Sequence, residues 1–277
     1  MFTLAGCGDK GFSDGPARVA RFCYPHDVEV HYPPDSPPVM LVADFDNNCL
    51  RRVLMHEGTG EHVTSWAGSN IGTPGFKDGH IKDALFNHPG GLAVRAPAPA
   101  ASTRDIVAGV GVGAGAGAGA GAGDTTEIFV ADTYNHAVRR ITCVRGSWQV
   151  ATIAGGCGKG FRDGLGSMAR FNCPTGLAIG AHGDIYVADF SNHAVRLVRR
   201  EASGVWRVST IVGQAVSCGD GEPEIGLSGF VDGPSGEARL NRPHGLTYDS
   251  DFSVLYVADC MNNRLRCVQG SVVSTLV

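Results

Sequence analysis

Four copies of one five-residue string constrain the fold of this 277-residue chain more than any other feature. The string reads Gly-Phe-x-Asp-Gly, and its copies start at Gly11, Gly75, Gly160 and Gly229. Eight residues after each aspartate stands a large apolar residue, and three residues further stands a proline. Such fixed spacing indicates a repeated structural unit that cannot bury its apolar residues alone. We therefore expect a fold in which similar neighbouring units stack on one another.

A second string, Val-Ala-Asp, also occurs four times, and an arginine follows each aspartate by seven residues. If the chain forms a hairpin with a four-residue turn here, the two charged side chains become diagonal neighbours on one face. We expect them to form an ion pair that holds the turn, while the alternative is a ring of arginines that binds phosphate or RNA. The pairs are Asp44 and Arg51, Asp132 and Arg139, Asp189 and Arg196, and Asp259 and Arg266.

The third copy shows how one unit folds. Its segments 176–179, 185–188, 194–198 and 205–212 are rich in β-branched and aromatic residues and are separated by short turns, so they predict four strands joined by hairpins. Radial stacking of such four-stranded units gives a β-propeller. We predict an all-β fold, in which residues 1–277 form one propeller region. The predicted blades cover about 26–68, 90–155, 175–213 and 245–277.

The connections between the blades contain the Gly-Phe-x-Asp-Gly strings. Each string is expected to lead from the outer strand of one blade to the inner strand of the next. The phenylalanines of the strings are expected to fill the gaps between adjacent blades. These residues are Phe12, Phe76, Phe161 and Phe230.

One blade carries a long insertion at about 95–127. Residues 106–123 within it are uncharged and consist almost entirely of glycine and alanine. Glycine disfavours helix by about 1 kcal/mol relative to alanine. We expect a low-complexity loop rather than a membrane span, although the length approaches the ~20 residues that a spanning helix needs.

The repeat resembles the NHL repeat. The third copy carries the pattern in Phe-Asn-x-Pro-x-Gly-Leu-Ala, which starts at Phe171, and in Ile-Tyr-Val-Ala-Asp-x-x-Asn-His-x-Val-Arg, which ends at Arg196. A linker of the form Asp-Gly…Ala-Arg-Phe is similar to that of multi-domain NHL proteins. The resemblance implies a propeller, usually of six blades, and does not by itself imply an activity.

Four blades are fewer than that ring contains. Residues 1–6 also resemble the outer strand of a preceding blade, as Ser274-Thr275-Leu276 resembles that of the last. We therefore expect this chain to form part of a larger, six-blade-type ring. The first and last blades would then present open edges through which copies could self-associate.

The position after each repeat proline begins the inner strand, so its side chain approaches the central channel. We predict a binding site at the channel mouth from these residues, which are His26, Gly90, Thr175 and His244. The related peptidyl-amidating lyases hold zinc with channel histidines, and a catalytic zinc site needs three protein ligands. The sequence offers two histidines, with Asp27 as the third candidate. The alternative is that these are polar residues exposed at the mouth. His136 and His193 are expected to bond within their turns.

We interpret the chain as a non-enzymatic scaffold that binds a protein partner, with no cofactor, no metal and no catalytic residue. The alternatives are a metal-dependent lyase or hydrolase that uses the channel, and an RNA-binding propeller. A net charge of −4 counts against nucleic acid because phosphate contacts dominate such affinity. Nine cysteines without a Cys-x-x-Cys pair, and an N-terminus without a signal peptide, lead us to expect an intracellular, cytoplasmic protein that does not bind membranes.

Overall fold

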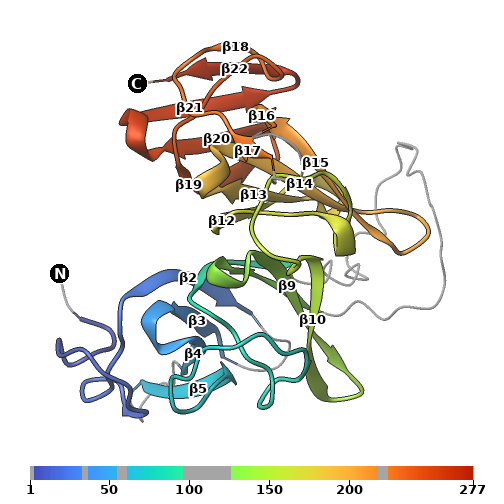
Figure 1. Ribbon diagram of the computed structural model, residues 1–277. Helices are drawn as coiled ribbons and strands as arrows, with labels where there is room; N and C mark the ends of the chain where they lie inside the picture. Colours follow the sequence, from blue (N-terminus) through green and yellow to red (C-terminus); the bar gives the residue numbers. More distant parts are fainter. Residues whose placement is uncertain (1–2, 33–36, 55–60, 96–125, 218–223, 277) are drawn as a thin grey trace, which may run out of the picture.

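A computed structural model describes residues 3–32, 37–54, 61–95, 126–217 and 224–276. The predicted all-β propeller with four blades is confirmed (Figure 1). The insertion predicted at about 95–127 lies almost entirely outside the described residues. Among the residues that are described, no helix has the length and apolar character needed to cross a membrane.

Each blade consists of four antiparallel strands that run from the channel outward in chain order. Blade 1 contains β2 (Pro25–His31), β3 (Val39–Asp44), β4 (Cys49–Leu54) and β5 (His62–Gly68). Blade 2 contains β7 (Pro89–Arg95), β8 (Glu127–Asp132), β9 (Ala137–Val144) and β10 (Ser147–Gly155). Blade 3 contains β12 (Pro174–Ile179), β13 (Ile185–Asp189), β14 (Ala194–Arg200) and β15 (Trp206–Val212). Blade 4 contains β19 (Pro243–Asp249), β20 (Val254–Asp259), β21 (Arg264–Gln269) and β22 (Val272–Thr275).

Every blade also has a short fifth strand at its outer edge, which the repeat pattern did not predict. It comes from the end of the Gly-Phe-x-Asp-Gly linker and pairs with the outer strand of the blade that follows the linker in sequence. These strands are β1 (Gly15–Pro16), β6 (Gly79–His80), β11 (Gly164–Leu165) and β18 (Gly233–Pro234). Because the linker covers the edge, the outer strand does not present a free row of backbone groups. The linker before blade 4 also contains two short strands that pair antiparallel, β16 (Ala215–Val216) and β17 (Ile225–Gly226).

A 3₁₀ turn joins the second and third strands of each blade. The turns are η1 (Phe45–Asn47), η2 (Thr133–Asn135), η5 (Phe190–Asn192) and η6 (Cys260–Asn262). The residue after each turn has a left-handed backbone with φ of 53° or 54°. This residue is asparagine or histidine, and it directly follows the asparagine that ends each turn. Since the inner strand starts opposite the end of the second strand, as Pro25 does opposite Asp44, all four turns lie at the same end of the channel.

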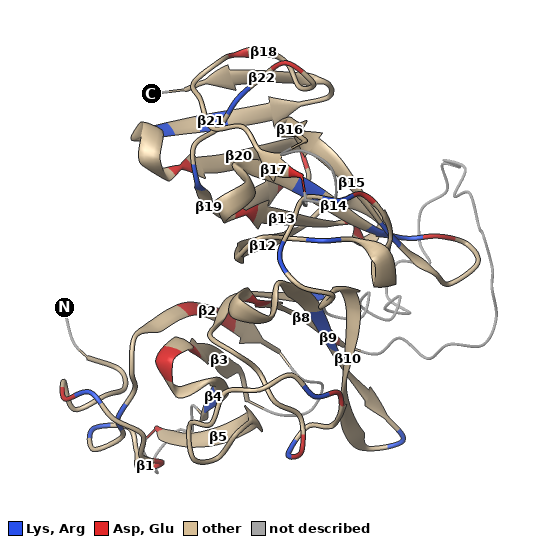
Figure 2. Ribbon diagram, in the orientation of Figure 1, with Lys and Arg blue, Asp and Glu red and all other residues tan. Residues whose placement is uncertain are grey.

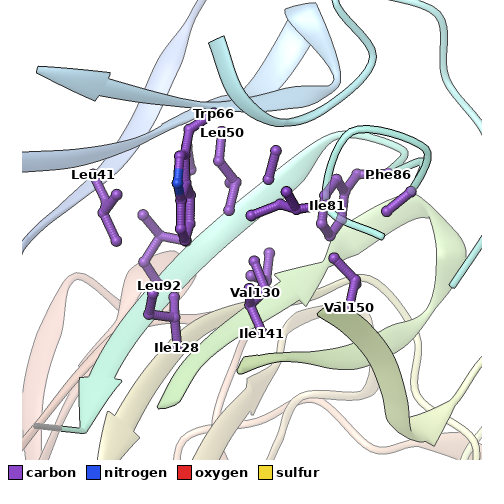
Figure 3. Close-up of a cluster of buried hydrophobic side chains, with 13 residues drawn as sticks. Leu41, Leu50, Trp66, Ile81, Phe86, Leu92, Ile128, Val130, Ile141 and Val150 are labelled. Atoms are coloured by element: carbon purple, nitrogen blue, oxygen red, sulfur yellow. The ribbon is translucent and has the colours of Figure 1, made fainter. Parts of the chain in front are cut away.

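The hydrophobic core is divided into clusters between successive blades. Figure 3 shows the cluster between blades 1 and 2, in which Leu41 and Leu50 of blade 1 face Phe86 of the linker and Ile128 and Ile141 of blade 2. Equivalent clusters join blade 2 to blade 3 and blade 3 to blade 4. Burial between blades therefore replaces a single central core.

The four blades form an open arc. Figure 1 shows blade 1, near the N-terminus, at one end of the arc and blade 4, near the C-terminus, at the other. In the part of the chain that is described, no hydrophobic cluster joins blade 4 to blade 1. Residues 3–6 form no strand, but Ala5 packs against a cluster on the outer side of blade 1.

Candidate functional site at the channel mouth

The turns at the channel mouth are fixed by a buried charge network, which is clearest in blade 3. Asp189 accepts hydrogen bonds from the backbone N–H of Asn172 (2.7 Å), from Asn192 Nδ2 (2.8 Å) and from the Arg196 guanidinium (2.7 Å). Arg196 also donates to Asp163 of the linker and to the carbonyl oxygens of Arg162 and Arg170. Its side chain is 0 % exposed, so two carboxylates and two backbone oxygens take the place of water around its terminal nitrogens.

The same network recurs in the other three blades. Each arginine donates to the Val-Ala-Asp aspartate of its own blade and to the aspartate of the preceding linker string. The linker aspartates are Asp14, Asp78, Asp163 and Asp232. The fixed position of these aspartates in the Gly-Phe-x-Asp-Gly string was the only feature of the sequence that pointed to their contact with the arginines. Since all four guanidinium groups are buried, they do not form a ring that phosphate or RNA can reach.

The linker phenylalanines do not fill the gaps between blades in the way the sequence suggested. They lie over the buried arginines instead, with the Phe161 ring 4.5 Å from the Arg196 guanidinium and Phe171 at 5.2 Å on the same group. Phe161 is buried, but Phe76 and Phe230 are 47 % and 53 % exposed. The linker phenylalanines therefore make cation–π contacts with the buried arginines of the network.

The two turn histidines also differ from the expectation, because each bonds to the next blade rather than within its own turn. His136 Nδ1 accepts from the backbone N–H of Cys173 (3.1 Å), and His193 Nδ1 accepts from that of Arg242 (3.1 Å). In blade 1 the same turn position is Asn48, whose Oδ1 accepts from the backbone N–H of His88 (2.9 Å). This turn position therefore joins neighbouring blades.

The four residues predicted at the channel mouth do come together. His26, Gly90, Thr175 and His244 line a cavity of about 220 Å³, together with Asp27 and the glycines of the inner strands. The rings of His26 and His244 lie 4.8 Å apart, so they bring the first and last blades into contact at the mouth. Burial, and then the neighbouring His26, lower the pKa of His244.

Further rings extend this site around the mouth. His26 stacks on Phe45 with the ring centres 4.9 Å apart, Phe45 meets the edge of His88 at 4.8 Å, and His88 lies 4.4 Å from Tyr134. On the other side, Phe190 meets His244 at 5.9 Å. We call these six residues the channel-mouth rim. They are His26, Phe45, His88, Tyr134, Phe190 and His244. Phe45, His88, Tyr134 and Phe190 could not be predicted as site residues from the sequence, because their turn and linker positions are not occupied by the same residue in all four copies.

The residues at the mouth do not fit a catalytic zinc centre, which needs about three protein ligands. Asp27, the candidate third ligand, accepts hydrogen bonds from the backbone N–H groups of Leu92 (2.8 Å) and Val28 (2.9 Å). No group of three or more metal-binding side chains occurs among the residues that the structure describes. His26 and His244 alone leave such a centre one ligand short.

The NHL repeat family profile matches residues 171–196. The chain is 38 % identical over 98 residues to human NHL repeat-containing protein 2, a match that covers 35 % of the chain and 12 % of that protein. It is 36 % identical over 72 residues to Protein SUPPRESSOR OF QUENCHING 1, chloroplastic, of Arabidopsis thaliana, which covers 26 % of the chain and 7 % of that protein. The matches thus span only a small part of each of these relatives.

Solved structures with similar folds have low sequence identity. One is a protein of unknown function from Bacteroides thetaiotaomicron (TM-score 0.45, 16 % identity, 99 % of this chain and 75 % of that one). Another is virginiamycin B lyase from Staphylococcus aureus (TM-score 0.44, 9 % identity, 91 % and 69 %). The sequence matches agree with the repeated blades and their shared turn network. Residues 171–196 therefore carry an NHL repeat, and the same spacing of residues recurs in the other three blades.

Proposed function

We propose that this NHL-repeat arc is a non-enzymatic scaffold that binds a protein partner at its channel-mouth rim. The observation that carries the proposal is the continuous series of six rings around the mouth, contributed by all four blades and by the linker before blade 2. Aromatic side chains are enriched where proteins bind each other, because each buries a large area and loses little conformational entropy.

Exposed apolar side chains of the turns extend the proposed binding surface beyond the rim. Tyr134 and Met261 occupy the same turn position in blades 2 and 4 and are 50 % and 54 % exposed, and Tyr24 at the mouth of blade 1 is 57 % exposed. Large apolar side chains gathered beside a polar mouth mark an interaction site more strongly than scattered ones do.

The rigidity of the turns gives the surface a fixed shape. Beneath the turns lie the buried aspartate–arginine networks, whereas the residues at the first two turn positions are not the same in all four blades. Variable side chains on a rigid repeated frame are the arrangement by which scaffolds present binding residues. Figure 2 shows acidic and basic residues interspersed over the blades, so contact with a protein fits the surface better than contact with a polyanion.

The test compares capture of proteins from an extract of the source cells by the immobilised chain and by matched variants. Tyr134→Ala and Met261→Ala remove exposed rim and turn side chains. Phe252→Ala is the control, because Phe252 is 69 % exposed and lies in the β19–β20 turn at the other end of the blade. We expect one or a few proteins to be captured by the wild type and the control and lost with the turn variants. Equal capture by all four proteins would contradict the proposal.

A further inference from the structure

Each blade presents two different faces to its neighbours. We call the side that packs on the next blade the forward face, which in blade 2 contains Phe129 and Val138. The side that packs on the preceding blade is the backward face, which in blade 3 contains Leu177 and Ile185. At all three boundaries within the chain, the forward face of one blade packs on the backward face of the next. The forward face of blade 4 and the backward face of blade 1 have no such neighbour within the described residues.

The forward face of blade 4 is exposed at positions that are buried elsewhere. Leu265 is 49 % exposed, whereas Leu50, Val138 and Val195 at the same repeat position are 0 % exposed. Ala258 is also partly exposed, whereas the matching alanine is buried in each of the other three blades. The face therefore has the composition of an inter-blade core without a covering blade.

The backward face of blade 1 shows the complementary difference. Val28 is 51 % exposed, whereas Leu92 and Leu177 at the same position are 1 % and 6 % exposed. Met40 is partly exposed at a position where Ile128 is buried. Ala5 packs on the outer part of this face, so the uncovered area is the inner part around Val28 and Met40.

A hydrogen-bonding pair is divided between the same two faces. At each boundary within the chain, the residue after the 3₁₀ turn accepts a bond from the backbone N–H of the residue before the next repeat proline. The fourth acceptor position is Asn263, and the fourth donor is the backbone N–H of Tyr24. Within the described residues, neither the Asn263 side chain nor the Tyr24 N–H has a hydrogen-bond partner.

We propose that two copies of this chain associate head to tail, with the forward face of blade 4 in one copy packed on the backward face of blade 1 in the other. Leu265 of one copy then lies against Val28 and Met40 of the second. The Asn263 side chain of the first copy accepts a hydrogen bond from the Tyr24 backbone N–H of the second. The contact continues the three inter-blade boundaries that the chain already contains. It is heterologous, so each copy retains one free face and longer assemblies form unless the ring closes.

The test measures the mass of the purified chain by light scattering across the micromolar concentration range. Leu265→Arg disables the forward face and Val28→Arg the backward face, while Ile71→Arg is the matched control at a residue that is 78 % exposed in a linker. We expect the wild type and the control to grow in mass with concentration and each face variant to remain a monomer. Because these side chains are exposed, circular dichroism should show that all variants fold.

Mixing the two face variants distinguishes this arrangement from a symmetric dimer. Leu265→Arg keeps its backward face and Val28→Arg keeps its forward face, so the mixture should form one heterodimer and nothing larger. Asn263→Ala should weaken association of the wild type by about five- to tenfold, as expected for loss of one hydrogen bond. A wild type that stays monomeric, or a Val28→Arg variant that still associates alone, would overturn the proposal.

Discussion

His136 Nδ1 accepts a hydrogen bond of 3.1 Å from the backbone N–H of Cys173, and this bond joins blade 2 to blade 3. His193 and Arg242 form the equivalent bond one boundary later. Each bond needs a neutral imidazole whose proton is on Nε2. Burial lowers the pKa of both histidines, with Lys159 and Arg242 as the next contributors for His136 and His193, respectively.

We predict that the free energy of unfolding falls as the pH is lowered from 7 to 5. A histidine whose pKa is lower in the folded chain than its unfolded value of ~6.5 stabilises the fold above that value, and this contribution is lost as the pH falls through the folded pKa. His136→Asn combined with His193→Asn should flatten the pH profile, because blade 1 makes the same bond with Asn48. Denaturant unfolding at several pH values measures the free energy of unfolding. If the double variant has the same pH profile as the wild type, these histidines do not cause the loss of stability at low pH.

Removal of one buried arginine should destabilise the chain strongly. Arg196→Met leaves Asp189 buried without its cation, which should cost about 3–5 kcal/mol. The control is Arg207→Ala, because Arg207 is 49 % exposed and pairs with Glu201 at the surface, where such a pair contributes at most about 1 kcal/mol. Urea unfolding of both variants gives the comparison, and similar midpoints would mean that the buried network does not hold the blade.

Phe171 should be among the most sensitive core positions, since it is 0 % exposed in the cluster between blades 2 and 3. Phe171→Ala should lower the free energy of unfolding by about 3–5 kcal/mol. Phe252→Ala, at a side chain that is 69 % exposed, should change it by less than about 0.5 kcal/mol. Equal effects in thermal and urea unfolding would place Phe171 outside the core.

Deletion of residues 96–123 should leave the blades intact. The flanking residues Arg95 and Glu127 pair in the β7–β8 hairpin and form an ion pair, and the deletion leaves three residues to connect them. Loop length changes closure entropy slowly, by about 0.6 kcal/mol for each doubling. We expect a soluble chain with an unchanged unfolding midpoint. Insoluble or less stable protein would show that the insertion packs on the blades.

The repeat spacing predicted the strands because period-2 patterns and turn residues are local signals. It also predicted that Arg196 lies diagonally from Asp189, since Arg196 pairs with Val187 in the hairpin. It did not predict β1, because Gly-Pro carries no strand signal and pairs only where an outer strand is already in place. The contact between His26 and His244 was also beyond the sequence, because it depends on how far the arc curves between blades 1 and 4.

The placement of the linkers has a consequence for how repeats can be added to such a gene by duplication. A segment that runs from the residue after Gly155 to Gly213 contains the linker, its aspartate, its short edge strand and the four strands of blade 3. Duplication in that frame supplies every new arginine with both of its carboxylates. Duplication from one inner strand to the next would leave the first new blade dependent on a linker encoded elsewhere. Lengthening of the array is therefore tolerated most readily when the recombination point falls directly after the glycine that ends an outer strand.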